Sequence, residues 1–346
     1  MDEHDRTRTP VAGRVEADDR PAPLPRRITV GIIVNPKHSA TLRAYADLVP
    51  QLQKAGAHYR SMTTSVERSG RWQAEQLIDW GADTVIILGG DGTIRAAAPV
   101  LAEAGTLTSL VPTGTANVLS RHIGLRSCRH AIDHCVRTVA SIIRDVPTNL
   151  RGIPVNAAEF RRADGSRHRT EFISLAGIGG DARAIAHHHF ATGLLGYTWG
   201  AARALFVVNF TASTGATVGA GDTSGTEGSA SGQVWSVMAS KVARPAGPIA
   251  VFPQARIDAE AFTVVTVGPI PDRLIARCRA WAGIATACLQ GRPQAHPLMD
   301  YRCTTDMWVS VESPVPAQLD GDLIGDCLEL RVSAGEKKLL VSAPTT

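Results

Sequence analysis

The chain has 346 residues, of which 44% are hydrophobic and 20% charged, and its 36 Lys and Arg against 32 Asp and Glu give a net charge of +4. This length predicts two domains, and the composition excludes an intrinsically disordered chain and an integral membrane protein. The near balance of charges, with only 5% aromatic residues for base stacking, argues against nucleic acid as a partner.

Residues 1–27 mix acidic and basic side chains and contain no apolar run. A secretory signal requires an apolar core, so this stretch is expected to be a disordered leader on a cytoplasmic protein. The six cysteines are scattered without a regular spacing, which is typical of reduced thiols in the cytosol. No disulfide is therefore expected.

Strand and helix patterns alternate from Ile28 to about Leu150. The pattern predicts strands at 28–34, 58–63, 83–88 and 106–111, and helices at 41–55 and 71–80. Because the apolar strands are continuous and alternate with helices, a parallel sheet covered on both faces is expected. Residues 28–150 are therefore predicted to form an α/β domain.

After Arg151 the pattern changes to short runs in which apolar and polar residues alternate. Such runs predict antiparallel strands around 153–160, 169–177, 233–240, 261–268 and 307–313. Helices are expected near 181–190, 194–208 and 273–289. The small, polar and Gly-rich stretch 211–232 is expected to be a flexible surface loop without chemistry.

A glycine-rich turn, Gly89-Gly90-Asp91-Gly92-Thr93, follows the apolar strand at 83–88 and precedes a helical stretch. Glycines let the backbone approach a ligand, and the N–H groups at a helix start attract an anion such as phosphate. Asp91 would repel a bare phosphate, but a Mg²⁺ ion can bridge its carboxylate and phosphate oxygens. The alternative is an ordinary turn capped by Thr93. Its position at the carboxyl end of a parallel strand favours the phosphate site.

Two further polar turns follow predicted strands, at Asn35-Pro36-Lys37-His38-Ser39 and at Pro112-Thr113-Gly114-Thr115-Ala116-Asn117. Because the carboxyl ends of parallel strands meet at one edge of a sheet, the three turns are expected to form one nucleotide crevice. Neither a Walker motif nor a kinase G-x-G-x-x-G motif occurs among them.

Other patterns are less informative. The run Gly177–Ala182 matches a dinucleotide fingerprint but lacks the acidic residue that should follow, so its glycines are expected to permit a tight turn at the domain junction. The spacing of two Cys/His clusters does not suit tetrahedral zinc; they are Cys128/His130/His134/Cys135 and His187–His189. Near the C-terminus, Gln318-Leu319-Asp320-Gly321-Asp322 has the local pattern of a surface β-turn.

Taken together, five motifs in this order resemble the bacterial diacylglycerol kinase-like lipid kinases; they lie at 35–39, 89–93, 112–125, 176–182 and 318–322. The resemblance extends from about Ile28 to the end of the chain. Its superfamily also includes sphingosine, ceramide and, more distantly, NAD kinases. It implies a Rossmann-like nucleotide domain (28–150), a β-sandwich lipid-substrate domain (151–312) and a segment (313–346) that returns to the cleft and first domain.

The resemblance also implies a site for ATP with Mg²⁺. The residues implied to bind the nucleotide are Asn35, Pro36, Lys37, Ser39, Thr64, Gly89, Gly90, Asp91, Gly92, Thr93, Arg95, Gly114, Thr115 and Asn117. Asp91 would hold the ATP-bound Mg²⁺. Asp322 takes the place of the family's catalytic base, which reverses the surface-turn interpretation. Lys37, Arg95 and Arg121 are candidates to neutralise phosphate charge, with solvated surface charge as the alternative for each.

The sequence departs from the family at three positions. Asp322 stands where the family has Glu and is one methylene shorter, and a misplacement of about 1 Å can cost roughly 10² in rate. Arg95 stands where Asn is common. The family's structural magnesium site has an Asp where this chain has Ala259, with Asp258 and Glu260 as candidate substitutes.

The expected activity is transfer of the γ-phosphoryl group of ATP to the primary hydroxyl of diacylglycerol, giving phosphatidic acid. The alternatives are a kinase for another lipid alcohol such as sphingosine or ceramide, an NAD kinase, and a nucleotide-binding regulator without turnover. The run at 112–125 and the Asp-Gly-Asp turn favour the lipid branch.

A lipid substrate implies peripheral contact with the inner face of the membrane. Residues 182–221 contain no acidic residue and carry apolar runs, so they could lie on an anionic leaflet. The alternative is a buried helix pair. A homodimer would be in keeping with the family.

Overall fold

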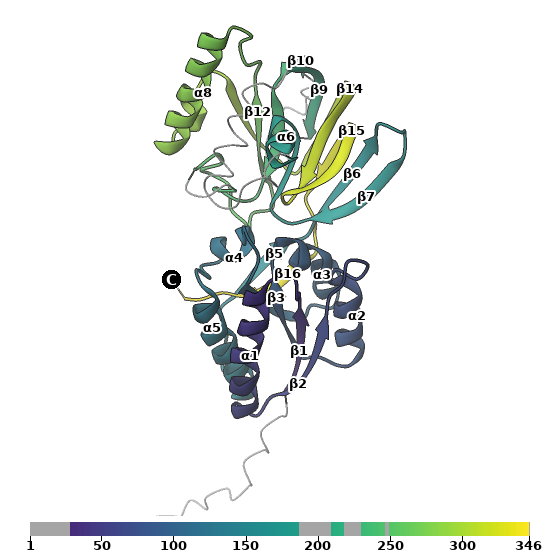
Figure 1. The fold of residues 1–346 in the computed structure, drawn as a ribbon, viewed down its shortest axis with the longest axis vertical. Coiled ribbons are helices and arrows are strands. Elements are labelled where there is room, and N and C mark those ends of the chain that lie inside the picture. The colour runs from purple at the N-terminus through teal and green to yellow at the C-terminus, as the bar shows by residue number, and fades with distance from the viewer. Residues whose placement is uncertain (1–27, 187–208, 218–229, 246–248, 346) are drawn as a thin grey trace, which may run out of the picture.

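A computed structural model describes residues 28–186, 209–217, 230–245 and 249–345. Within these ranges the strands form two sheets, which belong to two domains stacked along the long axis of the molecule (Figure 1). The lower domain in that view contains the first helices and strands of the chain, and the upper domain is rich in antiparallel strands.

The first sheet has the strand order β2-β1-β3-β4-β16-β5. Its first four strands along the chain are parallel to one another: β1 (Thr29–Val34), β2 (His58–Thr63), β3 (Thr84–Gly89) and β4 (Leu107–Pro112). Every residue of β3 is buried, as expected for a central strand covered on both faces. The predicted parallel sheet is confirmed.

Helices cover both faces of this sheet. The pair α1 (Ser39–Lys54) and α5 (Cys128–Ile143) packs together on one side, and the pair α2 (Arg71–Asp79) and α3 (Asp91–Glu103) packs together on the other (Figure 1). A short helix, α4 (Val118–His122), follows β4. The apolar strands and the inner faces of the helices form one core cluster.

The sheet is completed by β5 (Leu150–Pro154) and β16 (Lys338–Ser342). The last strand lies between β4 and β5, parallel to β4 and antiparallel to β5, and its Leu339 and Val341 side chains are fully buried. The chain therefore enters the second domain after β5 and returns to the first domain with β16. The sequence placed the two domain boundaries at 150/151 and 312/313. In the structure the chain leaves the first sheet after Pro154 and enters it again at Lys338.

The second sheet is antiparallel, with the path β13-β12-β11-β8-β14-β15-β6-β7 and with β9 and β10 attached beside β14. Its strands are β6 (Asn156–Arg162), β7 (Arg167–Phe172), β8 (Leu175–Gly179), β9 (Phe210–Thr217), β10 (Ala230–Val234), β11 (Ser236–Ser240), β12 (Phe262–Val267), β13 (Met299–Thr304), β14 (Asp306–Leu319) and β15 (Asp322–Ser333). The early part of β14 pairs with β9 and its end pairs with β8. The predicted combination of a parallel-sheet domain and an antiparallel β-rich domain is confirmed.

Two helices of this domain agree with the sequence, namely α6 (Gly180–Ala186) and α8 (Leu274–Leu289). A short 3₁₀ turn follows at Pro293–Ala295. The helix expected at 194–208 lies outside the described residues. No helix in the described ranges is long and apolar enough to span a bilayer.

The prediction of a loop over the whole of 211–232 is wrong at both ends, where β9 and β10 form an antiparallel pair. The small residues of β9 fit against β14, because a Cβ on Gly215 would lie 2.2 Å from Nε1 of Trp308. The glycine at position 215 therefore reflects close packing against an indole ring. Residues 218–229 lie outside the described ranges.

The glycines of 177–182 also differ from expectation, because they do not form a turn between domains. Gly177 and Gly179 lie in β8, and Gly180 begins α6 within the second domain. A Cβ on Gly180 would lie 2.0 Å from the Trp235 ring. Packing of this tryptophan accounts for that glycine.

Candidate active site

The three polar turns lie together at the carboxyl edge of the first sheet, where β1, β3 and β4 end. The Asn35 side-chain amide donates to Oγ1 of Thr93 at 2.8 Å, which joins the first turn to the glycine-rich turn. The glycine-rich turn also contacts the third turn through backbone, because a Cβ on Gly114 would lie 2.5 Å from Cα of Gly90. The expected convergence of the three turns is therefore present, and it requires glycine at the point of contact.

The glycine-rich turn leads directly into α3, which has 13 residues and begins at Asp91. Thr93 is buried and its N–H donates to the carbonyl of Gly90 at 3.1 Å. The first turn of a helix of this length presents N–H groups and the positive end of the helix dipole. The start of α3 therefore suits an anion, as the sequence predicted from its position.

Asp91 has a structural task that the sequence did not reveal. Its carboxylate oxygens accept the N–H groups of Val118 and Leu119 at 3.0 and 3.1 Å, so Asp91 caps the short helix α4. Burial raises the pKa of Asp91, and the two backbone hydrogen bonds act against that rise. The carboxylate thus holds the glycine-rich turn and α4 together.

The donor chemistry of Asp91 fits a magnesium ion brought by a nucleotide. A carboxylate has about four lone-pair sites, and two of those of Asp91 accept the N–H groups of Val118 and Leu119. In the described part of the chain, no group of three or more His, Cys, Asp or Glu side chains converges on one point. An ion here would therefore be held by one carboxylate together with phosphate oxygens, which is common for Mg²⁺.

The third turn is closed by Asn117, which adopts the left-handed conformation with φ 46°. Its side chain accepts the N–H of Gly114 at 3.0 Å and donates to the Gly114 carbonyl at 2.6 Å. Thr113 is buried against Thr41, with 2.8 Å between their hydroxyl oxygens. Thr115 is exposed at the tip of the turn, where its hydroxyl can reach a ligand.

The remaining predicted binding residues lie around the same edge. Thr64 is buried and its N–H donates to the carbonyl of Val34 at 2.9 Å, at the end of β2. Pro36, Lys37 and Ser39 are exposed beside Asn35. Arg121, in α4, is also exposed.

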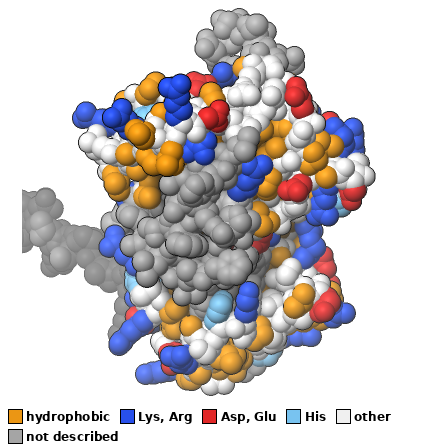
Figure 2. Space-filling view, turned by 45° about the horizontal axis from the view of Figure 1, so that its top comes forward, with side chains coloured by type: hydrophobic (Ala, Val, Ile, Leu, Met, Phe, Trp, Pro, Cys, Tyr) orange, Lys and Arg blue, Asp and Glu red, His pale blue; other side chains and the backbone are white. Residues whose placement is uncertain are grey.

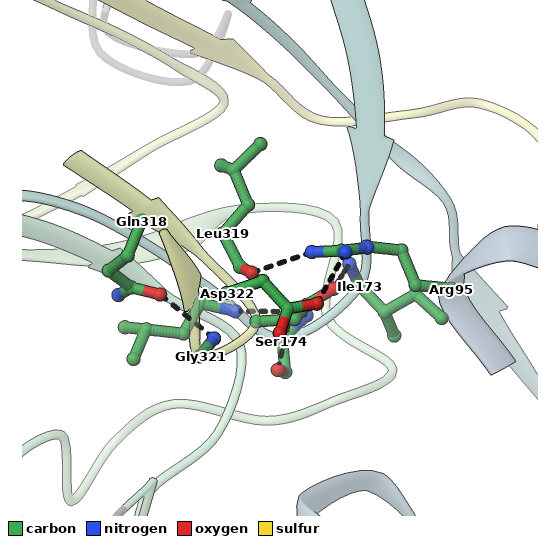
Figure 3. Close-up of polar contacts among 9 residues, drawn as sticks. Arg95, Ile173, Ser174, Gln318, Leu319, Gly321 and Asp322 are labelled. Carbon is green, nitrogen blue, oxygen red and sulfur yellow. Dashed lines mark hydrogen bonds and ion pairs between the residues drawn. The ribbon is translucent and has the colours of Figure 1, made fainter. Parts of the chain in front are cut away.

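The second domain reaches this edge through the hairpin between β14 and β15. Asp320 and Gly321 have φ values of 51° and 88°, which are typical of a two-residue type I′ turn. The next residue, Asp322, accepts a hydrogen bond from Nη2 of Arg95 at 2.6 Å (Figure 3). A Cβ on Gly92 would lie 3.5 Å from Oδ2 of Asp322. The hairpin is therefore not a free surface turn, and its carboxylate lies at the start of α3.

Arg95, a candidate to neutralise phosphate charge, contacts the hairpin. It comes from the first turns of α3 and also donates through Nη1 to the carbonyl of Leu319 at 2.7 Å (Figure 3). The Arg95 side chain is 23% exposed and the Asp322 side chain 59%. A positive charge engaged with Asp322 is less available to phosphate.

Asp320 supports the candidate site in a way that the sequence did not indicate. Its carboxylate accepts four hydrogen bonds, from the N–H groups of Ile173, Ser174 and Leu175 and from the hydroxyl of Ser174, at 2.6–3.1 Å. These contacts fix the turn that carries Asp322. The Asp-Gly pair signalled a turn in the sequence, but it gave no sign of the partners.

A second support links the hairpin to Asp181. Gln318, which is fully buried, accepts the N–H of Gly321 at 2.9 Å and donates to Oδ2 of Asp181 at 3.0 Å. Ser236 donates to the other oxygen of Asp181 at 2.6 Å. Burial raises the pKa of Asp181. The motif at 176–182 therefore supplies Asp181, which holds the hairpin in place through Gln318.

The residues near Asp258 do not fit the structural magnesium site implied by the resemblance. The Asp258 carboxylate pairs with Arg256 at 3.2 and 3.3 Å. Ala259 has no side-chain ligand, and its carbonyl accepts a hydrogen bond from the Lys241 ammonium. The candidate substitute Glu260 lies 3.8 Å from the ammonium of Lys338. The alanine at position 259 already made the implied ion doubtful from the sequence, and the contacts of Asp258 and Glu260 do not favour either as a substitute ligand.

The thiols of the first Cys/His cluster face β4. Cys128 donates to the carbonyl of Pro112 at 2.8 Å and Cys135 contacts that of Leu110 at 4.0 Å. Burial raises the pKa of Cys135 to about 12, so this thiol is protonated at neutral pH. His187–His189 lie outside the described residues.

Comparison with known proteins gives a family similarity for the first domain and a fold for most of the chain. Residues 29–147 match the family model of the diacylglycerol kinase catalytic domain. No curated protein matches the sequence. A putative diacylglycerol kinase from Bacillus anthracis str. Sterne superposes with a TM-score of 0.64 at 17% identity, covering 91% of this chain and 97% of that chain. Another diacylglycerol kinase structure from the same organism gives 0.60 at 15%, with the same coverage.

A more distant structural match is yeast NADH kinase complexed with NADH. Its TM-score is 0.51 at 11% identity, and the match covers 92% of this chain and 84% of that chain. Because the sequence identities to these solved structures are between 11% and 17%, the similarity shows a shared fold and nothing further. The two-domain arrangement described above is thus shared with proteins of both kinds.

Proposed function

Because the chain belongs to a diacylglycerol kinase-like family of the superfamily that also includes the NAD kinases, we propose that it is an ATP-dependent lipid kinase. The proposed reaction transfers the γ-phosphoryl group of ATP to the primary hydroxyl of diacylglycerol and yields phosphatidic acid and ADP. Family membership supports a phosphotransferase. The choice of lipid is our proposal.

The observation that carries the proposal is the position of Asp322. The second domain brings this carboxylate beside Gly92 and Arg95, at the start of the helix whose N–H groups suit a phosphate. A general base must lie within hydrogen-bond reach of the proton that it abstracts. The position of Asp322 next to the glycine-rich turn supports this role for an acceptor hydroxyl that approaches a nucleotide bound at that turn.

Each residue then has a role in the proposed reaction. The N–H groups at the start of α3 and the hydroxyl of Thr115 bind phosphate oxygens, and Asn35 fixes Thr93 in the turn. Lys37 and Arg121 are exposed at the same edge and would add positive charge. A magnesium ion brought by ATP would neutralise phosphate charge, held on the protein side by Asp91.

Asp322 would accept the proton of the lipid hydroxyl. The hydroxyl oxygen would attack the γ-phosphorus, and the bond between this phosphorus and the oxygen that links it to ADP would break. Arg95 contacts Oδ2, which leaves Oδ1 to face the hydroxyl. Such a base typically contributes roughly 10² to 10⁴ in rate. Positioning and charge neutralisation must supply the rest.

Much of the acid-free segment 182–221 lies outside the described residues. Among the described residues, we propose α8 as the site of membrane contact, because its apolar side chains are exposed. The side chains of Leu274, Ile275 and Leu289 are 64%, 71% and 68% exposed. The helix contains no acidic residue, and Arg273 and Arg279 are exposed along it. Apolar, basic and some acidic side chains lie interspersed over the second domain (Figure 2).

This composition suits an anionic lipid surface. Exposed apolar side chains can enter the headgroup region of a bilayer, and each basic residue near an anionic leaflet adds about 1 kcal/mol of attraction. Docking through α8 would bring the lipid-substrate domain to the membrane where the acceptor lipid resides.

The substrate proposal is tested with purified protein, labelled ATP and Mg²⁺, offered diacylglycerol, sphingosine, ceramide or NAD in separate reactions. Label is expected in phosphatidic acid. The Asp322→Asn variant should lose most of this transfer, while Asp322→Glu should retain it. Label in NAD alone would refute the lipid assignment, and ATP binding without transfer to any acceptor would favour a regulator.

The membrane proposal is tested by pelleting with vesicles of phosphatidylcholine alone or mixed with phosphatidylglycerol. Binding to the anionic vesicles is expected, and Leu274→Ser/Ile275→Ser should weaken it. The matched control Val146→Ser/Leu150→Ser alters two exposed apolar side chains of the first domain and should bind as before. If the α8 variant instead changes the molar mass in solution, the helix face is a contact between two copies of the chain and the membrane assignment is wrong.

A further inference from the structure

Lys241 is a buried cation in the second domain. It follows β11, its exposed fraction is 0%, and its ammonium donates to the carbonyls of Ala259 and Glu260 at 2.6 and 2.7 Å. Lysine is almost never fully buried unless it is paired. The side chain therefore has a definite structural task.

An aromatic ring favours a positive charge on Lys241, while burial acts against it. The Phe262 ring lies beneath the ammonium, with 4.6 Å between Nζ and the ring centroid, and an aromatic face attracts a cation. Phe262 in turn stacks on Phe172. Burial lowers the pKa of Lys241 to about 8, so the side chain still carries its proton at neutral pH.

These contacts occur where the resemblance implies a structural magnesium ion. Such an ion needs oxygen ligands, usually including a carboxylate, but position 259 is alanine and the Asp258 carboxylate pairs with Arg256. The Ala259 carbonyl, which could have served as a ligand, accepts a hydrogen bond from Lys241. A divalent ion beside this ammonium would also be repelled by it.

We propose that the Lys241 ammonium takes the place of the magnesium ion, holding residues 257–262 to the end of β11 as a cation built into the chain. The second domain then keeps its fold without a divalent ion at this position.

The built-in cation is linked to the hairpin that carries Asp322. The backbone N–H of Lys241 donates to the carbonyl of Ser174 at 2.8 Å, and Ser174 donates to the Asp320 carboxylate through both its N–H and its hydroxyl. One residue thus lies between the Lys241 backbone and the turn. A substitution that removes the Lys241 contacts is therefore expected to weaken the hydrogen bonds that hold the Asp320 turn.

The first test measures thermal unfolding of the full chain without nucleotide, in EDTA and in Mg²⁺. The wild-type melting temperature should be the same in both, and hydrogen exchange of residues 257–262 should be unaffected by EDTA. A melting temperature that falls in EDTA, with faster exchange in this segment, would overturn the proposal. This arm uses no variant, so it stands even if a substitution prevents folding.

The second test uses Lys241→Met, which keeps the length of the side chain and removes the charge. Its melting temperature should fall by about 5 °C or more, because two partly buried hydrogen bonds to carbonyls lose their donor. The matched control is Lys338→Met, which removes the neighbouring ammonium that lies 3.8 Å from Glu260 in an exposed ion pair and should have little effect. Equal melting temperatures for Lys241→Met and wild type would contradict the proposal.

The third test restores the missing ligand in Lys241→Met/Ala259→Asp. This double variant should gain a melting temperature that rises with Mg²⁺ and falls with EDTA, a response that wild type lacks. Failure to gain it would show that the ammonium and the ion are not alternatives at one position. All three readouts are independent of catalytic activity, so they can fail or succeed separately from the proposed kinase function.

Discussion

Arg95 and Asp322, which are 227 residues apart in the sequence, form an ion pair with 2.6 Å between Nη2 and Oδ2. The same guanidinium donates to the carbonyl of Leu319. One arginine at the start of α3 thus binds both sides of the β14–β15 turn and joins the two domains at the candidate site.

Arg95→Gln should lower kcat by roughly 10-fold to 10²-fold, because loss of the guanidinium leaves the Asp322 carboxylate less precisely positioned. KM for ATP should change little, since Arg95 is engaged with the hairpin. Arg95→Lys should be intermediate, because one ammonium cannot reproduce the geometry of the guanidinium. Steady-state kinetics with ATP varied would measure both parameters. A raised KM for ATP with unchanged kcat would instead assign Arg95 to phosphate.

Asp320→Asn should destabilise the protein by about 2–4 kcal/mol, because an amide cannot accept all four hydrogen bonds that the carboxylate accepts. Asparagine tolerates positive φ, so the turn conformation itself is kept. Denaturant unfolding provides the measurement. The control Asp326→Asn changes an exposed carboxylate on β15 and should alter stability by less than about 0.5 kcal/mol. Equal losses of unfolding free energy in the two variants would show that Asp320 stabilises the protein no more than an exposed carboxylate does.

Two variants of Asp91 should separate its structural task from its proposed metal-linked one. Asp91→Ala loses the acceptor for the N–H groups of Val118 and Leu119 and should cost about 1–2 kcal/mol, as for a lost helix cap. Asp91→Asn keeps one acceptor and should be more stable than the alanine variant. Both should lose phosphoryl transfer. Substantial activity in folded Asp91→Asn would mean that the carboxylate is not required for the metal.

Acidification should weaken the contact of His122 with the second domain. Burial lowers the pKa of His122 below its usual 6.5, its Nδ1 lies 2.8 Å from the Val118 carbonyl, and its Nε2 accepts the N–H of Arg244 at 3.4 Å. A histidine whose folded pKa is lowered contributes stability that is present above its unfolded pKa and is lost as pH falls toward the folded value.

The measurement is the melting temperature of wild type and His122→Gln between about pH 7.5 and about pH 5.5. The variant should show the smaller decrease on acidification, although some decrease should persist because burial also lowers the pKa of His134. Identical decreases in the two proteins would mean that His122 does not contribute.

The first domain could be predicted from the sequence because its signals are local. The run of apolar residues in β3 and the glycines after it identify a central strand and a turn within one short stretch. The same argument found the turns at Asn35 and Gly114. By contrast, β9 has a loop-like composition, and only its pairing with β14 makes it a strand.

The supports of the candidate site could not be predicted, because each depends on partners far away in the chain. The carboxylate of Asp320 contacts residues about 145 positions earlier. Arg95 has the charge to bind phosphate, and nothing near it in the sequence indicates Leu319 or Asp322 as partners. Lys241 likewise gives no sign of burial until the fold places Ala259 beside it.

The position of β16 has a consequence for the order of events during protein synthesis. This strand lies between β4 and β5, yet a ribosome makes it only after every strand of the second domain. Until then the nascent first domain has a gap in its sheet that exposes strand edges, which can pair wrongly with other chains. The second domain is thus an insertion between β5 and β16, and the first sheet can be completed only after the ribosome has made that insertion.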